Sequence, residues 1–87
     1  MATTTVRPKL YIKQGCPWCM EAEDFLQDNS IGYDVLEVRS NRTAYDEMVK
    51  LSGQTKAPVM DWNGEVLADF GAEELSAFLK KRGVIPA

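Results

Sequence analysis

The sequence contains no histidine, and its only cysteines are Cys16 and Cys19. Without histidine the chain can form neither a Ser-His-Asp triad nor an imidazole metal site. It also lacks the ~18–20 consecutive apolar residues of a membrane span, so we expect no membrane association. The net charge of −3 provides no basic face of the kind that binds nucleic acid, and we expect no such partner. Chemistry at neutral pH is left to thiols, carboxylates, lysine or tyrosine.

The length of 87 residues is that of one small domain, and the hydrophobic share of 45% and charged share of 26% are ordinary globular values. We therefore expect a single domain over residues 1–87, with residues 1–8 as a flexible lead that has no secretory signal. The absence of further cysteines is typical of a reducing compartment, which favours a cytoplasmic protein. We expect a monomer.

Side-chain periodicity predicts seven elements in the order β-α-β-α-β-β-α. Strands are expected over residues 9–12, 33–38, 58–62 and 65–68, and helices over about 17–29, 42–52 and 72–82. Asn63-Gly64 is a two-residue hairpin signal, whereas the first βαβ unit should be parallel and right-handed. The sequence thus predicts an α/β fold with a mixed four-stranded sheet. The candidate core and packing residues are Tyr11, Phe25, Leu26, Trp62, Phe70, Leu75, Phe78 and Leu79.

Cys16 and Cys19 lie where the first predicted strand gives way to the first predicted helix. Cys16 falls at the N-cap, followed by Pro17 at the first helical position. Unpaired N–H groups and the helix dipole favour a thiolate there. Cys19 lies about one turn later on the same side, where it can resolve a mixed disulfide by thiol–disulfide exchange. We expect Cys16 to be the exposed attacking thiol and Cys19 the resolving one.

Two other interpretations of the cysteine pair stay open. The pair can be half of a structural zinc site, although such sites usually take four Cys or His ligands and the rest would have to be carboxylates or a second chain. The two thiols can also have no role. The position after a strand, at the start of a helix and within a βαβ unit, favours the redox interpretation. Acidic residues in the next turns oppose a nearby thiolate: Glu21, Glu23 and Asp24.

The segment from Leu10 to Cys19 resembles the active site of the dithiol glutaredoxins, which carry C-P-Y-C after a strand and a lysine three residues before the first cysteine. Lys13 holds the lysine position and Trp18 replaces the tyrosine. Residues 52–58 resemble the family's S-G-x-x-T-V-P segment, whose proline is cis, and residues 69–75 are similar to its I-G-G-x-D-D-L turn. The resemblance covers nearly the whole chain and implies a thioredoxin-like three-layer fold.

The resemblance implies a glutathione-dependent thiol–disulfide oxidoreductase that acts through Cys16 and Cys19 in cell redox homeostasis. It implies glutathione as reductant, no metal, and disulfide-containing or glutathionylated proteins as partners. Lys13 would meet the glycine carboxylate of glutathione, the backbone of Ala57 would pair with its cysteinyl part, and the turn at Ala72 would bind its γ-glutamyl end. The implied glutathione contacts are Lys13, Trp18, Lys56, Ala57, Pro58, Gly71, Ala72 and Glu73.

The chain departs from the family pattern at two of these segments. Lys56 replaces a threonine, where it is either a second cation for the same carboxylates or a solvated side chain. Phe70 replaces the first glycine of the Gly-Gly pair and is expected to narrow the γ-glutamyl pocket. Trp18 is expected to be exposed, where it gates the site, stacks on substrate or merely covers the helix start.

Three alternative functions remain at this point. The first is a redoxin reduced by thioredoxin reductase, although the Ser-Gly-Phe-Arg segment of such proteins is missing. The second is a module that binds a [2Fe–2S] cluster between two chains with glutathione, against which Pro17 argues, because such sites tend to have a small residue after the first cysteine. The third is a binding domain without redox activity.

Overall fold

A computed structural model of the protein describes residues 8–85. The elements follow in the predicted order: β1 (Lys9–Ile12), α1 (Pro17–Asp28), β2 (Asp34–Glu37), α2 (Arg42–Ser52), β3 (Val59–Trp62), β4 (Glu65–Ala68) and α3 (Ala72–Lys81). Most of the expected flexible lead falls on residues 1–7, outside the described part. Pro8 belongs to the folded domain instead, because it is buried and its carbonyl accepts a 2.9 Å hydrogen bond from the N–H of Asp34.

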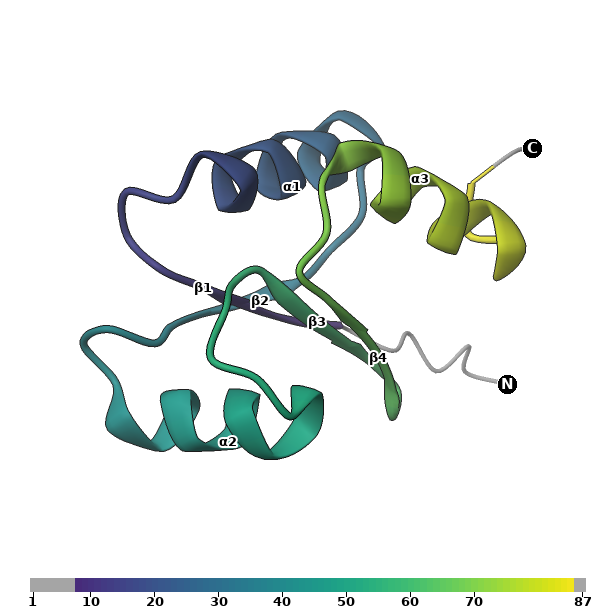
Figure 1. Ribbon diagram of the computed structural model, residues 1–87. Coiled ribbons are helices and arrows are strands. Elements are labelled where there is room, and N and C mark those ends of the chain that lie inside the picture. Colours follow the sequence, from purple (N-terminus) through teal and green to yellow (C-terminus); the bar gives the residue numbers. More distant parts are fainter. Residues whose placement is uncertain (1–7, 86–87) are drawn as a thin grey trace.

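The four strands form one mixed sheet in the order β2-β1-β3-β4. Strand β1 pairs with β2 in parallel, and β3 pairs with both β1 and β4 in antiparallel fashion. Helices α1 and α3 cover one face of the sheet and α2 covers the other (Figure 1). The predicted three-layer α/β architecture is confirmed. At the tip of the hairpin, Asn63 and Gly64 have φ angles of 51° and 94°, as a two-residue turn of this kind requires.

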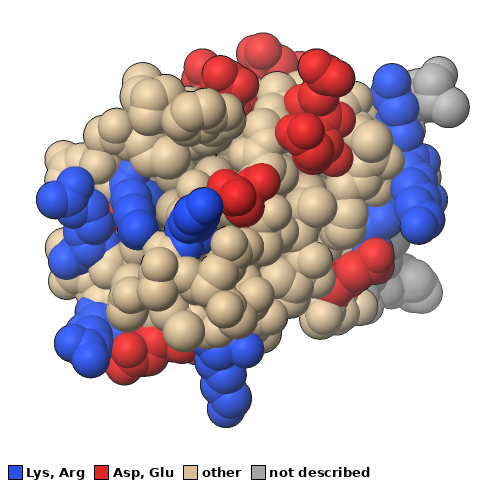
Figure 2. Space-filling model, in the orientation of Figure 1, with Lys and Arg blue, Asp and Glu red and all other residues tan. Residues whose placement is uncertain are grey.

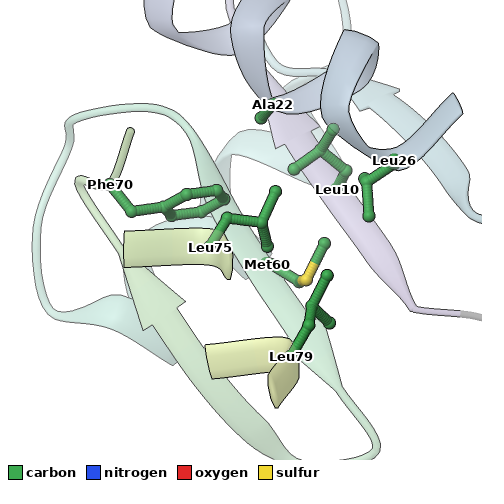
Figure 3. Packing of buried hydrophobic residues seen from close by; sticks show 7 residues of the cluster. All are labelled: Leu10, Ala22, Leu26, Met60, Phe70, Leu75 and Leu79. Atoms are coloured by element: carbon green, nitrogen blue, oxygen red, sulfur yellow. The ribbon is translucent and has the colours of Figure 1, made fainter. Parts of the chain in front are cut away.

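Two buried clusters hold the layers together, one on each face of the sheet. Successive strand residues point to opposite faces, so Leu10 and Met60 face α1 and α3, whereas Tyr11 and Val59 face α2. Figure 3 shows the first cluster, in which the ring of Phe70 packs beside Leu75. The expected packing role of Phe70 is therefore confirmed, with 2% of the residue exposed.

The edges of the first cluster differ from the expectation in part. Phe25 and Phe78, expected in the core by their spacing, are only partly buried and pack against the cluster from outside, whereas Trp62 packs at its edge as expected. Arg82, which follows Lys80 and Lys81 at the end of α3, lies over the rings of Trp62 and Phe78, with its guanidinium carbon 5.8 Å and 5.5 Å from the two ring centres. It also pairs with Glu65 of the hairpin. Arg82 thus connects the end of α3 to the sheet, which helical periodicity alone does not reveal.

A hydrogen bond from Tyr11 joins the sheet to α2. Its side chain is fully buried, and its hydroxyl donates a 2.6 Å hydrogen bond to Oε1 of Glu47. Burial and the Glu47 carboxylate both raise the pKa of Tyr11, which keeps the hydroxyl protonated as a donor.

No helix in residues 8–85 is long and apolar enough to cross a membrane.

We predict that Tyr11→Phe lowers the free energy of unfolding by about 1 kcal/mol, the usual net value of one such hydrogen bond. Urea denaturation measures the change. Tyr45→Phe is the matched control, because the Tyr45 hydroxyl has no hydrogen bond within the described residues and should change stability less. Equal losses in the two variants would contradict the assignment of this hydrogen bond as the stabilising contact.

Candidate active site

Cys16 is the N-cap of α1, as predicted. Its backbone is extended (φ −89°, ψ 116°), and Pro17 occupies the first helical position. The N–H of Cys16 donates to the carbonyl of Lys13 at 3.1 Å, which closes a tight turn between β1 and the helix. Its Sγ accepts a 3.2 Å hydrogen bond from the N–H of Cys19. The sulfur therefore receives an N–H group that the helix leaves without a backbone partner.

Cys19 is 1% exposed, whereas Cys16 is half-buried. The pKa of Cys19 is raised to about 12, mainly by burial and then by its hydrogen bond with Cys16. Cys19 therefore stays protonated at neutral pH and cannot be the first nucleophile. The expected contrast between a more exposed Cys16 and a protected Cys19 is confirmed. One acidic residue of the following turns, Glu23, is drawn toward the hydroxyl of Tyr33, which donates to it at 3.0 Å.

Glu37, at the end of β2, holds the loop that carries Lys13. Its carboxylate accepts hydrogen bonds from the N–H of Gln14 at 2.8 Å and from the N–H and hydroxyl of Ser40 at 2.7 and 2.8 Å. These bonds, that from Gln14 above all, lower the pKa of Glu37 to about 2. Sequence patterns alone do not point to this residue. Its role depends on the parallel pairing that sets Glu37 opposite Ile12 at the end of β1.

The Ala57–Pro58 peptide bond is cis, as the resemblance implies. Pro58 is buried, and its carbonyl accepts a 2.9 Å hydrogen bond from the N–H of Asp69, which ties the start of β3 to the loop before α3. Ala57 is half-buried, and no backbone hydrogen bond joins it to another residue of the described part. Its N–H and carbonyl are available for strand-like pairing with a bound peptide group.

A small hollow of about 240 Å³ connects the first turn of α1 to the loop before α3; it is lined by Trp18, Ala57, Asp69, Phe70, Gly71 and Glu74. Trp18 is 59% exposed, which confirms that it lies at the surface. A Cβ atom on Gly71 would lie 3.5 Å from Cδ1 of Trp18, an ordinary contact, and 3.3 Å from Oε1 of Glu74, whose carboxylate would have to shift slightly. The Gly71 N–H already donates to Glu74 Oε1 at 2.8 Å.

A second and larger hollow, of about 670 Å³, lies on the other side of the Cys16 turn and is lined by Lys13, Val38, Arg39, Ser40, Arg42 and Tyr45. Figure 2 shows one group of Lys and Arg side chains at the end of the molecule where α1 and α2 begin and a second group at the opposite end, with Asp and Glu side chains gathered along the top, over α1 and α3. We call the larger hollow, with its cations Lys13, Arg39 and Arg42, the basic hollow.

The structure distributes the implied glutathione contacts between these two places. Trp18, Ala57 and Gly71 share the small hollow, and Lys13 lies in the basic hollow. The remaining implied contacts line neither hollow: Lys56, Pro58, Ala72 and Glu73. Sequence reasoning did not identify Asp69, Glu74, Arg39 or Arg42, which line the two hollows. Among the described residues, no group of three or more His, Cys, Asp and Glu side chains could hold a metal ion.

The fold and the paired thiols at the start of α1 define a redox protein of the thioredoxin-fold class. The glutaredoxin family model matches residues 9–67, so the chain belongs to the glutaredoxin family. Among curated proteins, it is 27% identical over 73 residues to an uncharacterized glutaredoxin-like 8.6 kDa protein of Clostridium pasteurianum, covering 84% of this chain and 97% of that one. It is also 27% identical over 78 residues to glutaredoxin 3 of Escherichia coli K12, covering 90% of this chain and 92% of that one.

Solved structures show the same architecture. The thioredoxin-like protein BC3987 superimposes with a TM-score of 0.76 at 26% identity, covering 84% of this chain and 100% of that one. The glutaredoxin of Archaeoglobus fulgidus gives a TM-score of 0.74 at 16% identity, covering 88% and 89%. A buckwheat glutaredoxin–glutathione complex gives 0.71 at 13% identity, covering 93% and 74%. These similarities confirm the thioredoxin-like fold.

We predict that iodoacetamide labels Cys16 of the reduced, folded protein at least about 100-fold faster than Cys19. With a pKa of about 12, only about one Cys19 thiol in thirty thousand is ionised at about pH 7.5. Peptide mass spectrometry measures each rate. In urea, where burial is lost, both residues should label at similar rates. Labelling of Cys19 as fast as Cys16 in the folded state would contradict its assignment as the protected thiol.

Proposed function

We propose that the protein is a glutathione-dependent thiol–disulfide oxidoreductase that reduces protein disulfides and glutathione mixed disulfides. The observation that carries the proposal is the unequal pair at the start of α1. Cys16 Sγ is accessible and accepts the Cys19 N–H at 3.2 Å, whereas Cys19 is buried. An accessible sulfur at a helix N-terminus is suited to attack, and a protected thiol one turn away is suited to resolve.

In the first step the Cys16 thiolate attacks the glutathione sulfur of a glutathione–protein mixed disulfide. The bond between the two substrate sulfurs breaks, and the protein leaves as a thiolate that takes up a proton. Glutathione is then bound to Cys16 through a new disulfide. The electron pair that reduces the substrate protein comes from the Cys16 sulfur, which is oxidised.

The second step returns Cys16 to its thiolate by one of two routes. A second glutathione thiolate attacks the bound glutathione sulfur and releases glutathione disulfide. Alternatively, Cys19 loses its proton, attacks Cys16 Sγ and releases glutathione, which leaves a Cys16–Cys19 disulfide for two further glutathione molecules to reduce. Once Cys16 is in a mixed disulfide it carries no negative charge, so one of the causes of the raised Cys19 pKa is gone.

Three features of the chain support glutathione as the reductant. Lys13 provides a cation for a carboxylate, the open backbone of Ala57 offers strand-like pairing, and Trp18 lies beside Ala57 at the same hollow. Membership of the glutaredoxin family adds to this support, as does the buckwheat structure of similar fold that was solved as a glutathione complex. We extend the proposal to a reducing compartment, the cytoplasm, because such a pair must be kept reduced to act.

The acidic lining of the small hollow favours a second candidate, a redoxin served by thioredoxin reductase. Asp69 and Glu74 line the place proposed for the γ-glutamyl end of glutathione, and the Gly71 N–H already donates its hydrogen bond to the Glu74 carboxylate. Both features weaken the binding of a carboxylate at the start of α3. In this candidate the chemistry of Cys16 and Cys19 is the same, but a flavoprotein reduces their disulfide in place of glutathione.

We predict that the wild-type protein turns over a small glutathione mixed disulfide with glutathione as sole reductant. Cys16→Ser should lower the rate at least about 100-fold because it removes the nucleophile, whereas Cys19→Ser should keep activity by the one-thiol route. Coupled formation of glutathione disulfide measures the rate. Turnover with NADPH and thioredoxin reductase but none with glutathione would replace the first candidate by the second.

A further inference from the structure

The basic hollow offers more positive charge than one carboxylate of a small thiol uses. Lys13, Arg39 and Arg42 all line it, and its volume of about 670 Å³ is nearly three times that of the small hollow. Volumes of this size are typical of ligand sites. The hollow begins at the tight turn in which the carbonyl of Lys13 accepts the Cys16 N–H. A group held there therefore lies beside the turn that carries Cys16.

The cations of the hollow are weakly engaged within the protein. Within residues 8–85, no carboxylate pairs with Lys13 or Arg39. Arg39 reaches only the carbonyl of Gln14, at 3.4 Å. Arg42 pairs with Asp46 at 3.1 Å, but both side chains are largely exposed. An exposed ion pair of this kind contributes little to stability. A negatively charged partner can therefore recruit all three cations without breaking a buried contact.

The backbone around the hollow favours an extended acidic peptide over a phosphate group. A phosphate site is typically built from several converging backbone N–H groups. Here the N–H groups of Gln14 and Ser40 already donate to Glu37, and the side chain of Asn41 accepts the N–H of Ala44 at the start of α2. What remains is three cations, of which Arg39 and Arg42 are exposed and Lys13 is half-buried. They lie on the loop after β1, the loop after β2 and the first turn of α2, which matches side-chain carboxylates spaced along a chain.

We propose that the basic hollow docks an acidic segment of the disulfide-containing substrate protein, adjacent to the cysteine that Cys16 attacks. The inference rests on the proposed oxidoreductase function and names a class of substrate for it. The protein as a whole carries a net charge of −3 and repels acidic peptides at long range. A preference for acidic substrates must therefore come from the basic hollow, and substitutions of its cations should remove it.

The test compares two symmetric disulfide-linked peptide dimers, one with Asp and Glu beside the cysteine and one with Asn and Gln at the same places. Either sulfur of such a dimer gives the same reaction. Cys16 attacks one sulfur, the other peptide leaves as a thiol, and Cys19 then releases the first peptide and forms the Cys16–Cys19 disulfide. The protein is used in its reduced form for a single turnover, so its own two thiols supply both electrons and no external reductant enters the result.

We expect the acidic dimer to be reduced about tenfold faster than the neutral one at low salt, from a few exposed ion pairs worth about twofold to fivefold each. The preference should fall below about threefold at about 0.5 M salt, because screening acts on exposed charges. The double variant Arg39→Gln/Arg42→Gln should lose most of it. The matched control is Lys80→Gln/Lys81→Gln, which changes the net charge equally at the opposite end of the molecule and should keep it (Figure 2).

Equal rates for the two dimers, or a preference that both double variants share, would overturn the proposal while leaving the oxidoreductase function intact. Reduction of neither dimer would instead count against the function. In that case binding of the acidic peptide with serine for cysteine, followed by the amide NMR signals of Lys13 and Arg39, decides the docking site separately. A different result would assign the hollow to a phosphate and reject an acidic segment. In that result, inorganic phosphate inhibits reduction of the acidic dimer but not of the neutral one, and the peptide does not shift the amide NMR signals of Lys13 and Arg39.

Discussion

The hydrogen bond that Cys16 Sγ accepts from the Cys19 N–H fixes the relation between the two sulfurs, and the remaining chemistry depends on it. Pro17 has no N–H, so the next donors of the helix start are free to face the sulfur. The same turn that offers the Cys19 N–H turns the Cys19 side chain into the interior, where burial keeps it protonated. One N-cap therefore produces an accessible thiol and a protected thiol from two chemically identical residues.

The turn at Cys16 is held in place by Glu37, a residue of a different strand. Because β1 and β2 are parallel, their C-terminal ends meet at the same edge of the sheet, and Ile12 lies opposite Glu37. The carboxylate of Glu37 binds the loops that follow both strands, through Gln14 and Ser40. This contact explains how Lys13 and Arg39, 26 positions apart in the sequence, come to line one hollow.

Local signals in the sequence were sufficient for the elements and for the cysteine pair. The N-cap at Cys16 and the Asn63-Gly64 turn each depend on a few neighbouring residues, and each was predicted in place. The basic hollow was not predicted, because Arg39 follows β2 and Arg42 begins α2, whereas Lys13 follows β1, and only strand register brings them together. The same limit applies to Arg82 on Trp62, which depends on how α3 packs on the hairpin.

The two hollows beside Cys16 carry opposite charge, with Lys13, Arg39 and Arg42 on one side and Asp69 and Glu74 on the other. On the proposed function, glutathione would match this polarity in part. Its glycine carboxylate would face the basic side and its γ-glutamyl ammonium the acidic side, whereas its second carboxylate would find the Gly71 N–H already bonded to Glu74.

On the proposed function, an acidic segment of a protein substrate and the glycine carboxylate of glutathione compete for the same cations. A cycle through both thiols avoids this competition. The substrate protein is reduced and released as the Cys16–Cys19 disulfide forms, and only then does glutathione enter the emptied hollow. The buried Cys19, by forming the disulfide with Cys16, thus separates in time two ligands that compete for the basic hollow.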